Sequence, residues 1–302
     1  MKKKNIIFIS HSEKRPSGGA KIIYRYSEYI NNVRNFSSEV VHIKKNKLSK
    51  FVNSFKKRLK KNHKYESGWQ LKDIKTENNF DYKWFKHGVK VRKNFKFNKH
   101  KDFVIIPEIF AHLAQDLLIK KKIEYGIFVQ NGYVINSTNN ESKLKIAYDN
   151  AKFILSYSNN ISECIKLKFP GLKTKIIKTS CSIELKKNNL NGKKNLITYM
   201  SRKLPFHSQL VLNYLKPHLS KNWKIVNLNG LSEIQTYKFL KKSKIFLSFS
   251  SFEGLGLPPA EAALAGNYVV GYTGEGGAEY WSKPLFTKID SGNIVLFVKT
   301  II

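Results

Sequence analysis

The chain has few cysteines and no long apolar run. Only Cys164 and Cys181 occur among 302 residues, without the spacing of metal ligands, so we expect reduced thiols and no disulfide framework. No stretch approaches the roughly 18 apolar residues of a membrane-spanning helix. The apolar run at residues 6–9 is too short for a signal peptide. A cytoplasmic location is therefore expected.

Acidic residues are also scarce. The chain has 55 Lys and Arg against 21 Asp and Glu, a formal net charge of +34. The imbalance is uneven, because residues 1–194 hold 43 basic and 15 acidic side chains, whereas residues 195–302 hold 12 and 6. Such a field attracts anionic lipid, nucleic acid or acidic polymers. A general bias of the proteome toward lysine would produce the same excess of positive charge.

Two segments without acids carry much of this charge. The first, from Lys44 to Lys64, holds ten Lys or Arg and has apolar residues at helical spacing. It predicts either a basic amphipathic helix on an anionic membrane, at the inner face of the membrane, or a solvated helix packed through its apolar residues. Both interpretations stay open. The apolar residues are Phe51, Val52, Phe55 and Leu59.

The second segment, from Lys83 to Lys101, interleaves aromatic side chains with cations. The aromatic residues are Trp84, Phe85, Phe95 and Phe97. Aromatic rings among cations can stack on the bases of a single-stranded nucleic acid. They can equally anchor at a lipid headgroup layer, or belong to the core of the protein.

Apolar runs alternate with helical patterns along the chain. Strands are predicted at residues 5–10, 39–43, 102–106, 126–129, 151–156 and 173–178, and then at 196–200, 224–228, 244–249, 267–272 and 294–298. This alternation indicates mostly parallel, doubly wound sheets. Residues 186–194 are polar and predict a linker. We expect two Rossmann-like domains, residues 1–188 and 189–302, with ligands at the carboxyl ends of the strands.

The most informative stretch is residues 252–261, Phe-Glu-Gly-Leu-Gly-Leu-Pro-Pro-Ala-Glu. It joins the strand predicted at 244–249 to a small-residue helix, and Pro258 and Pro259 fit the first turn of that helix. Glycines let the backbone approach a ligand, and a helix N-terminus favours an anion. The carboxylates of Glu253 and Glu261 can accept hydrogen bonds from sugar hydroxyls. Equally, Glu261 could serve only the helix dipole and Glu253 could be an exposed loop acid.

This stretch resembles the Glu-x7-Glu motif of retaining GT-B glycosyltransferases, the family 4-like enzymes of glycosyl transferases group 1. The resemblance is strongest over residues 195–290. It implies an α/β fold of two Rossmann-like doubly wound domains that face a central cleft. It places Glu253 at the catalytic position, against the transferred sugar, and Glu261 at the nucleotide ribose. The amides of Gly254, Leu255, Gly256 and Leu257 would contact sugar hydroxyls and phosphate.

Further site residues follow other predicted strands. The resemblance places Gly18 and Gly19, in a glycine loop after the first strand, against the donor phosphates. Arg202 and Lys203, after the strand at 196–200, would neutralise the donor diphosphate, because Arg grips phosphate with two donors and Lys supplies a point charge. Glu108 and Asn131 follow two central strands and are candidates for the acceptor site, and for Glu108 the donor site stays open as well. Each could instead be an ordinary turn or surface residue.

The expected activity is transfer of a sugar from a nucleotide-diphosphate sugar to a glycan or lipid-linked acceptor, with retention, in cell-envelope polysaccharide synthesis. No cofactor or metal is expected, since protein cations replace it, and no nucleic acid partner is expected. Two alternatives stay open: a basic nucleic-acid-binding protein, and an inactive scaffold derived from a transferase. The scaffold is favoured by the ending at Ile302, because GT-B chains usually end with helices that cross back onto the first domain. Two interpretations of this ending stay open: an abbreviated C-terminal domain, or a truncated gene.

Overall fold

The computed structural model describes residues 4–12, 14, 16–45, 74–77, 80–135, 140–181, 183 and 192–302. The chain divides into two compact units. The first comprises Met1–Tyr157 and Ile161–Cys181, and the second comprises Ser158–Asn160 and Ser182–Ile302. Almost all of the predicted amphipathic helix beginning at Lys44, and most of the predicted linker, lie outside the described residues.

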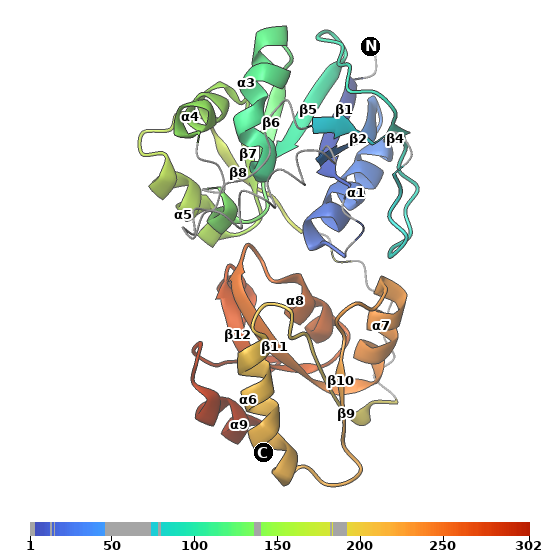
Figure 1. Cartoon of the computed structure of the whole chain (residues 1–302), viewed down its shortest axis with the longest axis vertical. Helices are drawn as coiled ribbons and strands as arrows, with labels where there is room; N and C mark the ends of the chain where they lie inside the picture. Colours follow the sequence, from blue (N-terminus) through green and yellow to red (C-terminus); the bar gives the residue numbers. More distant parts are fainter. Residues whose placement is uncertain are drawn as a thin grey trace, which may run out of the picture. The chain divides into compact units, whose positions relative to one another are not determined.

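The first unit is built on one sheet with helices at its sides (Figure 1). Its strands are β1 (Lys4–His11), β2 (Phe36–Lys45), β3 (Ile74–Thr76), β4 (Val91–Arg92), β5 (Asp102–Pro107), β6 (Tyr125–Val129), β7 (Ile154–Ser156) and β8 (Ile176–Lys178). Its α-helices are α1 (Gly18–Asn31), α3 (Ala114–Leu117), α4 (Glu141–Asn150) and α5 (Asn159–Lys168). The short 3-10 helices are η2 (Glu108–Leu113), η3 (Ile119–Lys121) and η4 (Gly132–Val134).

The order of the strands is β3-β2-β1-β5-β6-β7-β8, with β4 paired to β2. All of these pairs are parallel except β2 with β3. From β1 the chain turns to β2 on one side, and it later returns to β5 on the other side. The order therefore reverses between β1 and β5, and in open parallel sheets ligands bind at the carboxyl ends of such a pair.

Local sequence explains the beginning of this unit. Residues 7–9 of β1 are all buried, as expected for a central parallel strand covered on both faces. Ser17 caps α1 by accepting the N–H of Ala20. The cap places Gly18 and Gly19 inside the first turn of α1. The prediction of a glycine loop before the helix was therefore wrong in its boundary.

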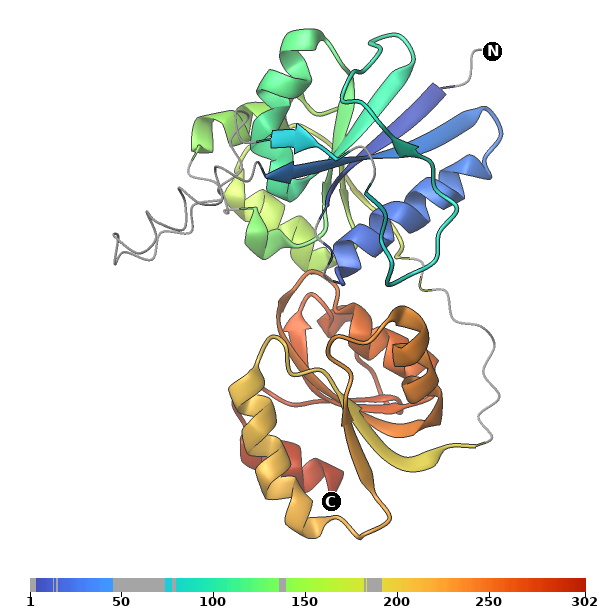
Figure 2. The same ribbon diagram turned by 45° about the vertical axis from the view of Figure 1, so that its right-hand side comes forward.

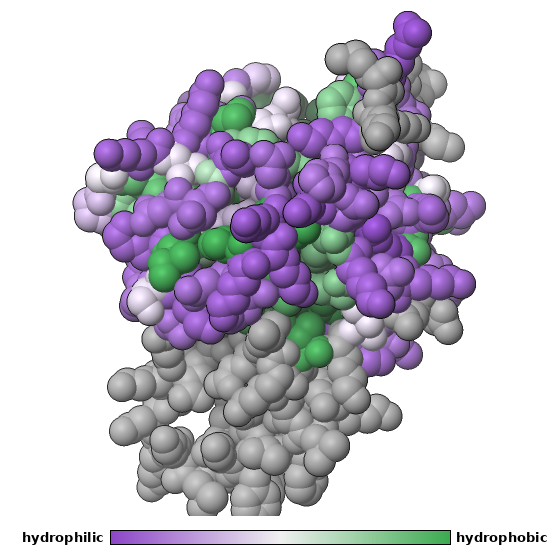
Figure 3. Space-filling model, turned by 90° about the horizontal axis from the view of Figure 1, so that it is seen from above, coloured by the Kyte–Doolittle hydropathy of each residue, from purple (hydrophilic) through white to green (hydrophobic). Residues whose placement is uncertain are grey.

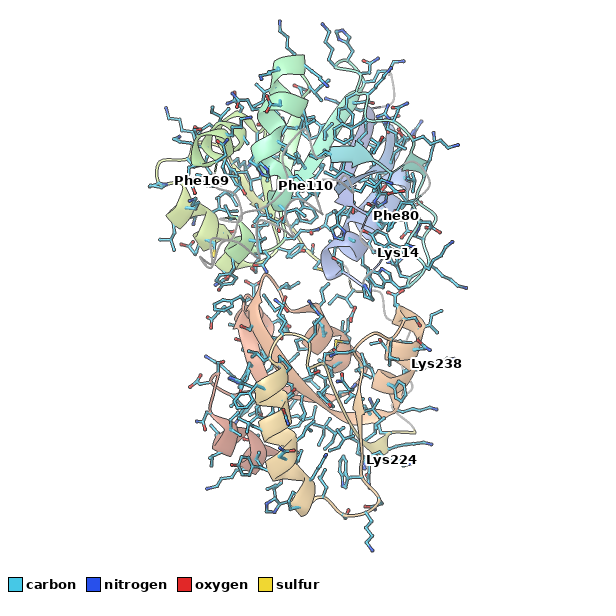
Figure 4. All side chains as sticks on the ribbon, in the orientation of Figure 1. Lys14, Phe80, Phe110, Phe169, Lys224 and Lys238 are labelled. Carbon is cyan, nitrogen blue, oxygen red and sulfur yellow. The ribbon has the colours of Figure 1, made fainter. Side chains whose placement is uncertain are left out.

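Buried aromatic side chains pack on α1 and β2. Phe85 is buried and its ring lies 5.3 Å from the ring of Tyr24, edge to face. Phe80, labelled in Figure 4, lies 4.8 Å from the imidazole of His42. The imidazole donates from Nδ1 to the carbonyl of His11, so its Nε2 accepts the Tyr24 hydroxyl at 2.6 Å. Phe85 of the basic segment is thus a core residue.

The second unit has a smaller sheet, in the order β10-β9-β11-β12-β13. Its strands are β9 (Lys194–Tyr199), β10 (Lys224–Asn227), β11 (Ser243–Glu253), β12 (Tyr268–Glu275) and β13 (Phe286–Lys288), and all of its pairs are parallel. Its helices are α6 (Pro205–Leu215), η5 (Lys216–His218), α7 (Glu233–Lys242), α8 (Leu257–Leu264), η6 (Ala278–Tyr280) and α9 (Ile294–Ile301). Figure 2 shows this unit from a second direction.

Each face of this sheet has its own core. Neighbouring residues of a strand point to opposite faces, so Leu247 packs in the cluster with α6 and α9, whereas Phe246 packs in the cluster with α7 and α8. On β12, Val270 likewise packs in the cluster with α6 and α9, and Val269 packs in the cluster with α7 and α8. The near-continuous apolar run of β11 is the signature of a strand buried on both faces.

The strand predicted at residues 294–298 was wrong, because these residues form helix α9. The side chain of Asn293 caps this helix by accepting the N–H of Leu296. Phe297 and Val298 are buried, while Val295 and Leu296 are exposed. An apolar run this short has no reliable period, so the pattern did not separate strand from helix.

A lysine fixes the amino-terminal edge of the second unit. The Nζ of Lys193 donates to three backbone carbonyl oxygens, of Leu240 at 3.1 Å, Ser243 at 2.7 Å and Ala265 at 2.7 Å. These carbonyls lie at the ends of α7 and α8 and at the start of β11. A cation also suits the negative end of a helix dipole. Lys193 thus ties three elements to the chain that enters β9.

Hydrophilic side chains cover most of the face of the first unit drawn in Figure 3. In the second unit, Lys224 and Lys238 are exposed (Figure 4). Within the residues that the structure describes, no helix has the length and apolar character needed to cross a bilayer.

Replacing Lys193 by methionine should lower the free energy of unfolding by about 2 kcal/mol, because three carbonyls lose their charged donor. Lys194→Met is the matched control, since that neighbouring side chain is exposed. Urea unfolding of both variants measures the difference. Equal midpoints for the two variants would show that the three contacts contribute nothing.

Candidate functional site

The order of the second sheet reverses between β9 and β11. The chain leaves β9 for β10 on one side and returns to β11 on the other side. Arg202 and Lys203 follow the carboxyl end of β9, and Glu253 is the last residue of β11. The topology thus brings the predicted basic pair and the first acid of the motif to the position where open α/β sheets bind ligands.

Lys203 contacts three consecutive residues at the end of β11. Its Nζ lies 3.0 Å from Oε1 of Glu253 and donates to the carbonyl oxygens of Ser251 at 2.8 Å and Phe252 at 3.3 Å. Both side chains of the ion pair are mostly buried. The backbone is irregular here, because the pairing of β11 with β12 shifts register between Ser250 and Glu253.

The loops after β11 and β12 lie backbone against backbone. The N–H of Gly276 donates to the carbonyl of Glu253 at 3.2 Å. A Cβ atom on Gly276 would stand 2.1 Å from the carbonyl oxygen of Gly254, a distance that no side chain can occupy. The hydroxyl of Tyr280 donates to the carbonyl of Gly256 at 2.6 Å. Glycine at 276 is therefore required for the motif loop to keep its shape.

Two α-helices in the described part of this unit begin without a side-chain cap. Helices α6 and α8 have Leu204 and Gly256 at their N-caps, and neither makes a side-chain capping bond. In contrast, α7 has a capping box of Ser232 and Gln235, and Asn293 caps α9. The uncapped helices follow β9 and β11, the two strands at the reversal. A helix start without its own cap can leave N–H donors for another acceptor, such as an anion. At α8 these are only the amides of Gly256 and Leu257, because Pro258 and Pro259 have no N–H.

The remaining motif residues have the following positions. Arg202 is exposed, and Glu261 lies half-buried in α8. Pro258 and Pro259 occupy the first turn of α8, as predicted. Gly256 has a φ of 79°, which favours glycine. Donor contacts of these residues, and of Gly254, Leu255 and Leu257, stay predictions.

In the first unit, Glu108 joins the ends of two strands. It follows β5, its side chain is only 5% exposed, and its two oxygens accept the N–H groups of Gln130 and Asn131, each at 3.1 Å. Burial raises the pKa of Glu108 to about 7, although these N–H groups act in the opposite direction. The side chain of Asn131 accepts the N–H of Tyr133. An acceptor-binding role for Glu108 and Asn131 stays a prediction.

Gln130 extends this connection to α1. Its Nε2 donates to the carbonyl of Gly19 at 3.0 Å, and a Cβ atom on Gly19 would lie 2.3 Å from its Oε1. The predicted residues Gly19, Glu108 and Asn131 are thus brought together through Gln130 at the ends of β1, β5 and β6.

The sequence reasoning missed several of these residues. Tyr280 has no local motif, and its partner lies 24 residues away. Gln130 stands beside the candidate Asn131 but was given no role, and its partner lies 111 residues away. Gly276 was not singled out either, although a Gly-Gly pair after a strand signals close backbone approach. Among the described residues, no three His, Cys, Asp or Glu side chains gather as a metal site would require.

Two parallel doubly wound units, each with its reversal in strand order, define the GT-B fold of glycosyltransferases. The solved structure of TarM has a TM-score of 0.63 at 10% identity, over 99% of this chain and 91% of that one. The lipopolysaccharide outer core galactosyltransferase WaaB has a TM-score of 0.61 at 14% identity, over 98% and 89%.

A third similar structure is a TarM mutant from S. aureus in complex with fondaparinux, alpha-GlcNAc-glycerol and UDP. Its TM-score is 0.50 at 13% identity, over 67% of this chain and 48% of that one. The chain thus spans about half the length of that protein. No protein-family model matches the chain, and no curated protein matches it.

Gly276→Ala should lower the free energy of unfolding by about 3 kcal/mol, because the new methyl group meets the Gly254 carbonyl and forces the two loops apart. Gly88→Ala is the control, since nothing lies within 4 Å of a Cβ atom there. Urea unfolding compares the two variants. A Gly276→Ala protein as stable as the control would contradict the close packing of the loops.

Glu108 should make stability depend on pH. Its pKa rises from 4.5 to about 7 on folding, so the folded state keeps a proton that the unfolded state releases. The stabilisation is fully present below about pH 4.5 and is lost as pH rises through about 7. A change of this size corresponds to about 3 kcal/mol.

Replacing Glu108 by glutamine removes this titration. The stability difference between wild type and Glu108→Gln should therefore change by about 3 kcal/mol between pH 4.5 and 7.5, moving in favour of the variant as pH rises. Urea midpoints across this range measure it. Glu141→Gln, at an exposed acid, is the control variant. Parallel curves for wild type and Glu108→Gln would refute the raised pKa.

Proposed function

We propose that the chain is a glycosyltransferase that moves a sugar from a nucleotide-diphosphate sugar to a glycan or lipid-linked acceptor. The observation that carries the proposal is the meeting of Lys203 with Glu253 at the strand-order reversal of the second unit. One cation and one carboxylate at this point suit a ligand that has both phosphate and sugar hydroxyl groups.

The roles of the residues follow from their chemistry. Arg202 is exposed after β9 and can grip phosphate with two donors, and Lys203 adds a point charge beside it. The uncapped N-termini add a few backbone donors: the amides of Phe206 and His207 in α6, and those of Gly256 and Leu257 at α8, whose prolines have no N–H. These groups would stabilise the negative charge that grows on the departing diphosphate. Protein cations would thus do the work of a metal ion.

Glu253 would hold the hydroxyls of the transferred sugar, and Lys203 keeps its carboxylate in place before the donor arrives. A positioned acceptor of this kind lowers the barrier by orienting the sugar. Glu261, one helical turn into α8, would receive the ribose hydroxyls. Gly18 and Gly19, at the start of α1, would lie against the donor phosphates. Retention at the anomeric carbon is proposed from the resemblance of the motif.

The first unit is proposed to bind the acceptor, with Glu108 and Asn131 shaping its site. The known proteins of similar fold include a lipopolysaccharide outer core galactosyltransferase and a TarM structure with UDP and alpha-GlcNAc-glycerol. They support a nucleotide-sugar donor and an acceptor in envelope polysaccharide synthesis. Attachment to an anionic inner membrane surface through the segment that begins at Lys44 is proposed from its charge.

Nucleotide diphosphates should stabilise the protein against heat. At a concentration of one hundred times Kd, the right nucleotide adds about 2.7 kcal/mol to the free energy of unfolding. Thermal unfolding with UDP, GDP, ADP and dTDP identifies the base, and the matching nucleotide sugars can then be tested for transfer to glycan acceptors.

Glu253→Ala should abolish transfer, at least about a hundredfold, while the variant still folds and binds the nucleotide diphosphate. Glu163→Ala, which removes an exposed acid from α5, is the control and should keep full activity. Transfer by Glu253→Ala at the wild-type rate would end the proposed assignment. A wild-type protein that binds no nucleotide diphosphate would favour the scaffold interpretation.

A further inference from the structure

Phe252 combines two unusual properties for an aromatic residue. Its φ is 50°, in the left-handed region that a bulky side chain rarely adopts. Its side chain is also 64% exposed, although phenylalanine normally gains stability by burial. Glycine at this position would remove both the backbone strain and the exposed apolar ring. A strained and exposed residue that persists at the end of a ligand-binding strand is a candidate for a functional role.

The surroundings show how this conformation is held. The ammonium of Lys203 contacts the carbonyls of Ser251 and Phe252 and the carboxylate of Glu253. Three consecutive residues thus converge on one cation, and the β11–β12 pairing shifts register across the same residues. The contacts that place Glu253 therefore also fix the backbone that carries the ring of Phe252.

Other exposed aromatic residues differ from Phe252. Tyr29 and Tyr214 are exposed to a similar degree, but both lie within regular helices, α1 and α6, and neither has a positive φ. Among the described residues, Phe252 is the aromatic residue with a positive φ. The combination is specific to the end of β11, beside the motif acid.

We infer that the ring of Phe252 is the apolar surface on which the sugar of the donor packs while Glu253 accepts its hydroxyl groups. A pyranose has C–H groups on its faces and hydroxyl groups at its edge, and the negative face of an aromatic ring attracts such C–H groups. A carboxylate and an aromatic ring on adjacent residues supply both kinds of contact. This inference rests on the proposed function, and it adds Phe252 as a residue that recognises the sugar of the donor.

The test compares the affinity for a nucleotide diphosphate with the affinity for its sugar conjugate. Isothermal titration of wild type and Phe252→Gly with UDP and UDP-glucose, or with the pair that the base screen selects, gives the gain in affinity due to the sugar. In Phe252→Gly this gain should fall by about fivefold, while affinity for the diphosphate alone stays within about twofold. Tyr214→Leu, which removes an exposed ring from α6, should change neither value.

Stability gives a second and independent readout. Phe252→Gly relieves the left-handed strain, so its urea midpoint should be at least that of wild type, whereas Phe252→Leu keeps the strain and should gain nothing. Higher or equal stability with a lost sugar contribution supports the inference. A sugar contribution that Phe252→Gly keeps in full, or a change in acceptor KM alone, overturns it.

If the proposed function is wrong, the titrations give a different result. In that case wild type would bind neither the diphosphate nor its sugar conjugate, and no variant would need to be compared. If wild type binds both, and binds the conjugate more tightly, the proposed function stands and Phe252→Gly decides the inference alone.

Discussion

The arrangement at the end of β11 depends on one ammonium group. Lys203 neutralises Glu253 and binds the two preceding carbonyls. Lysine suits this position because its charge is compact and offers three donors at one point, whereas the guanidinium of arginine is planar and forked. Lys203 follows β9 and its partners end β11, so the contact couples the two strands on either side of the reversal. The carboxylate of Glu253 is thereby oriented by a loop 50 residues earlier in the chain.

The two units fix their strand ends by different chemistry. In the second unit, the motif loop packs on the loop after β12 without side chains between them, because Gly276 allows backbone contact. In the first unit, the buried carboxylate of Glu108 receives the N–H groups after β6, and Gln130 carries the connection on to Gly19. Both solutions make loops at a strand-order reversal rigid, which suits a site that must be ready before its ligand arrives.

Much of the fold could be predicted from local pattern. The apolar run of β11 and the prolines that start α8 define a strand, a loop and a helix in consecutive residues, and Ser232 with Gln235 defines a helix start. The strand predicted at residues 294–298 was wrong, because a short apolar run fits strand and helix equally. From the sequence, Lys203 and Glu253 could be expected to lie at the same edge of the sheet, but their ion pair could not be predicted. The positive φ of Phe252 had no sequence signal, because a positive φ is expected for glycine and not for phenylalanine.

Lys193 stands at the entrance to β9 and binds the ends of α7, α8 and the start of β11. It therefore belongs to the folded body of the second unit, although it lies within residues 186–194, which were predicted as a linker. A fragment of the second unit that begins after Lys193 would lack this ammonium group. The three carbonyls that it contacts have no other charged donor among the described residues. A fragment that keeps the contacts of the second unit must therefore include this lysine.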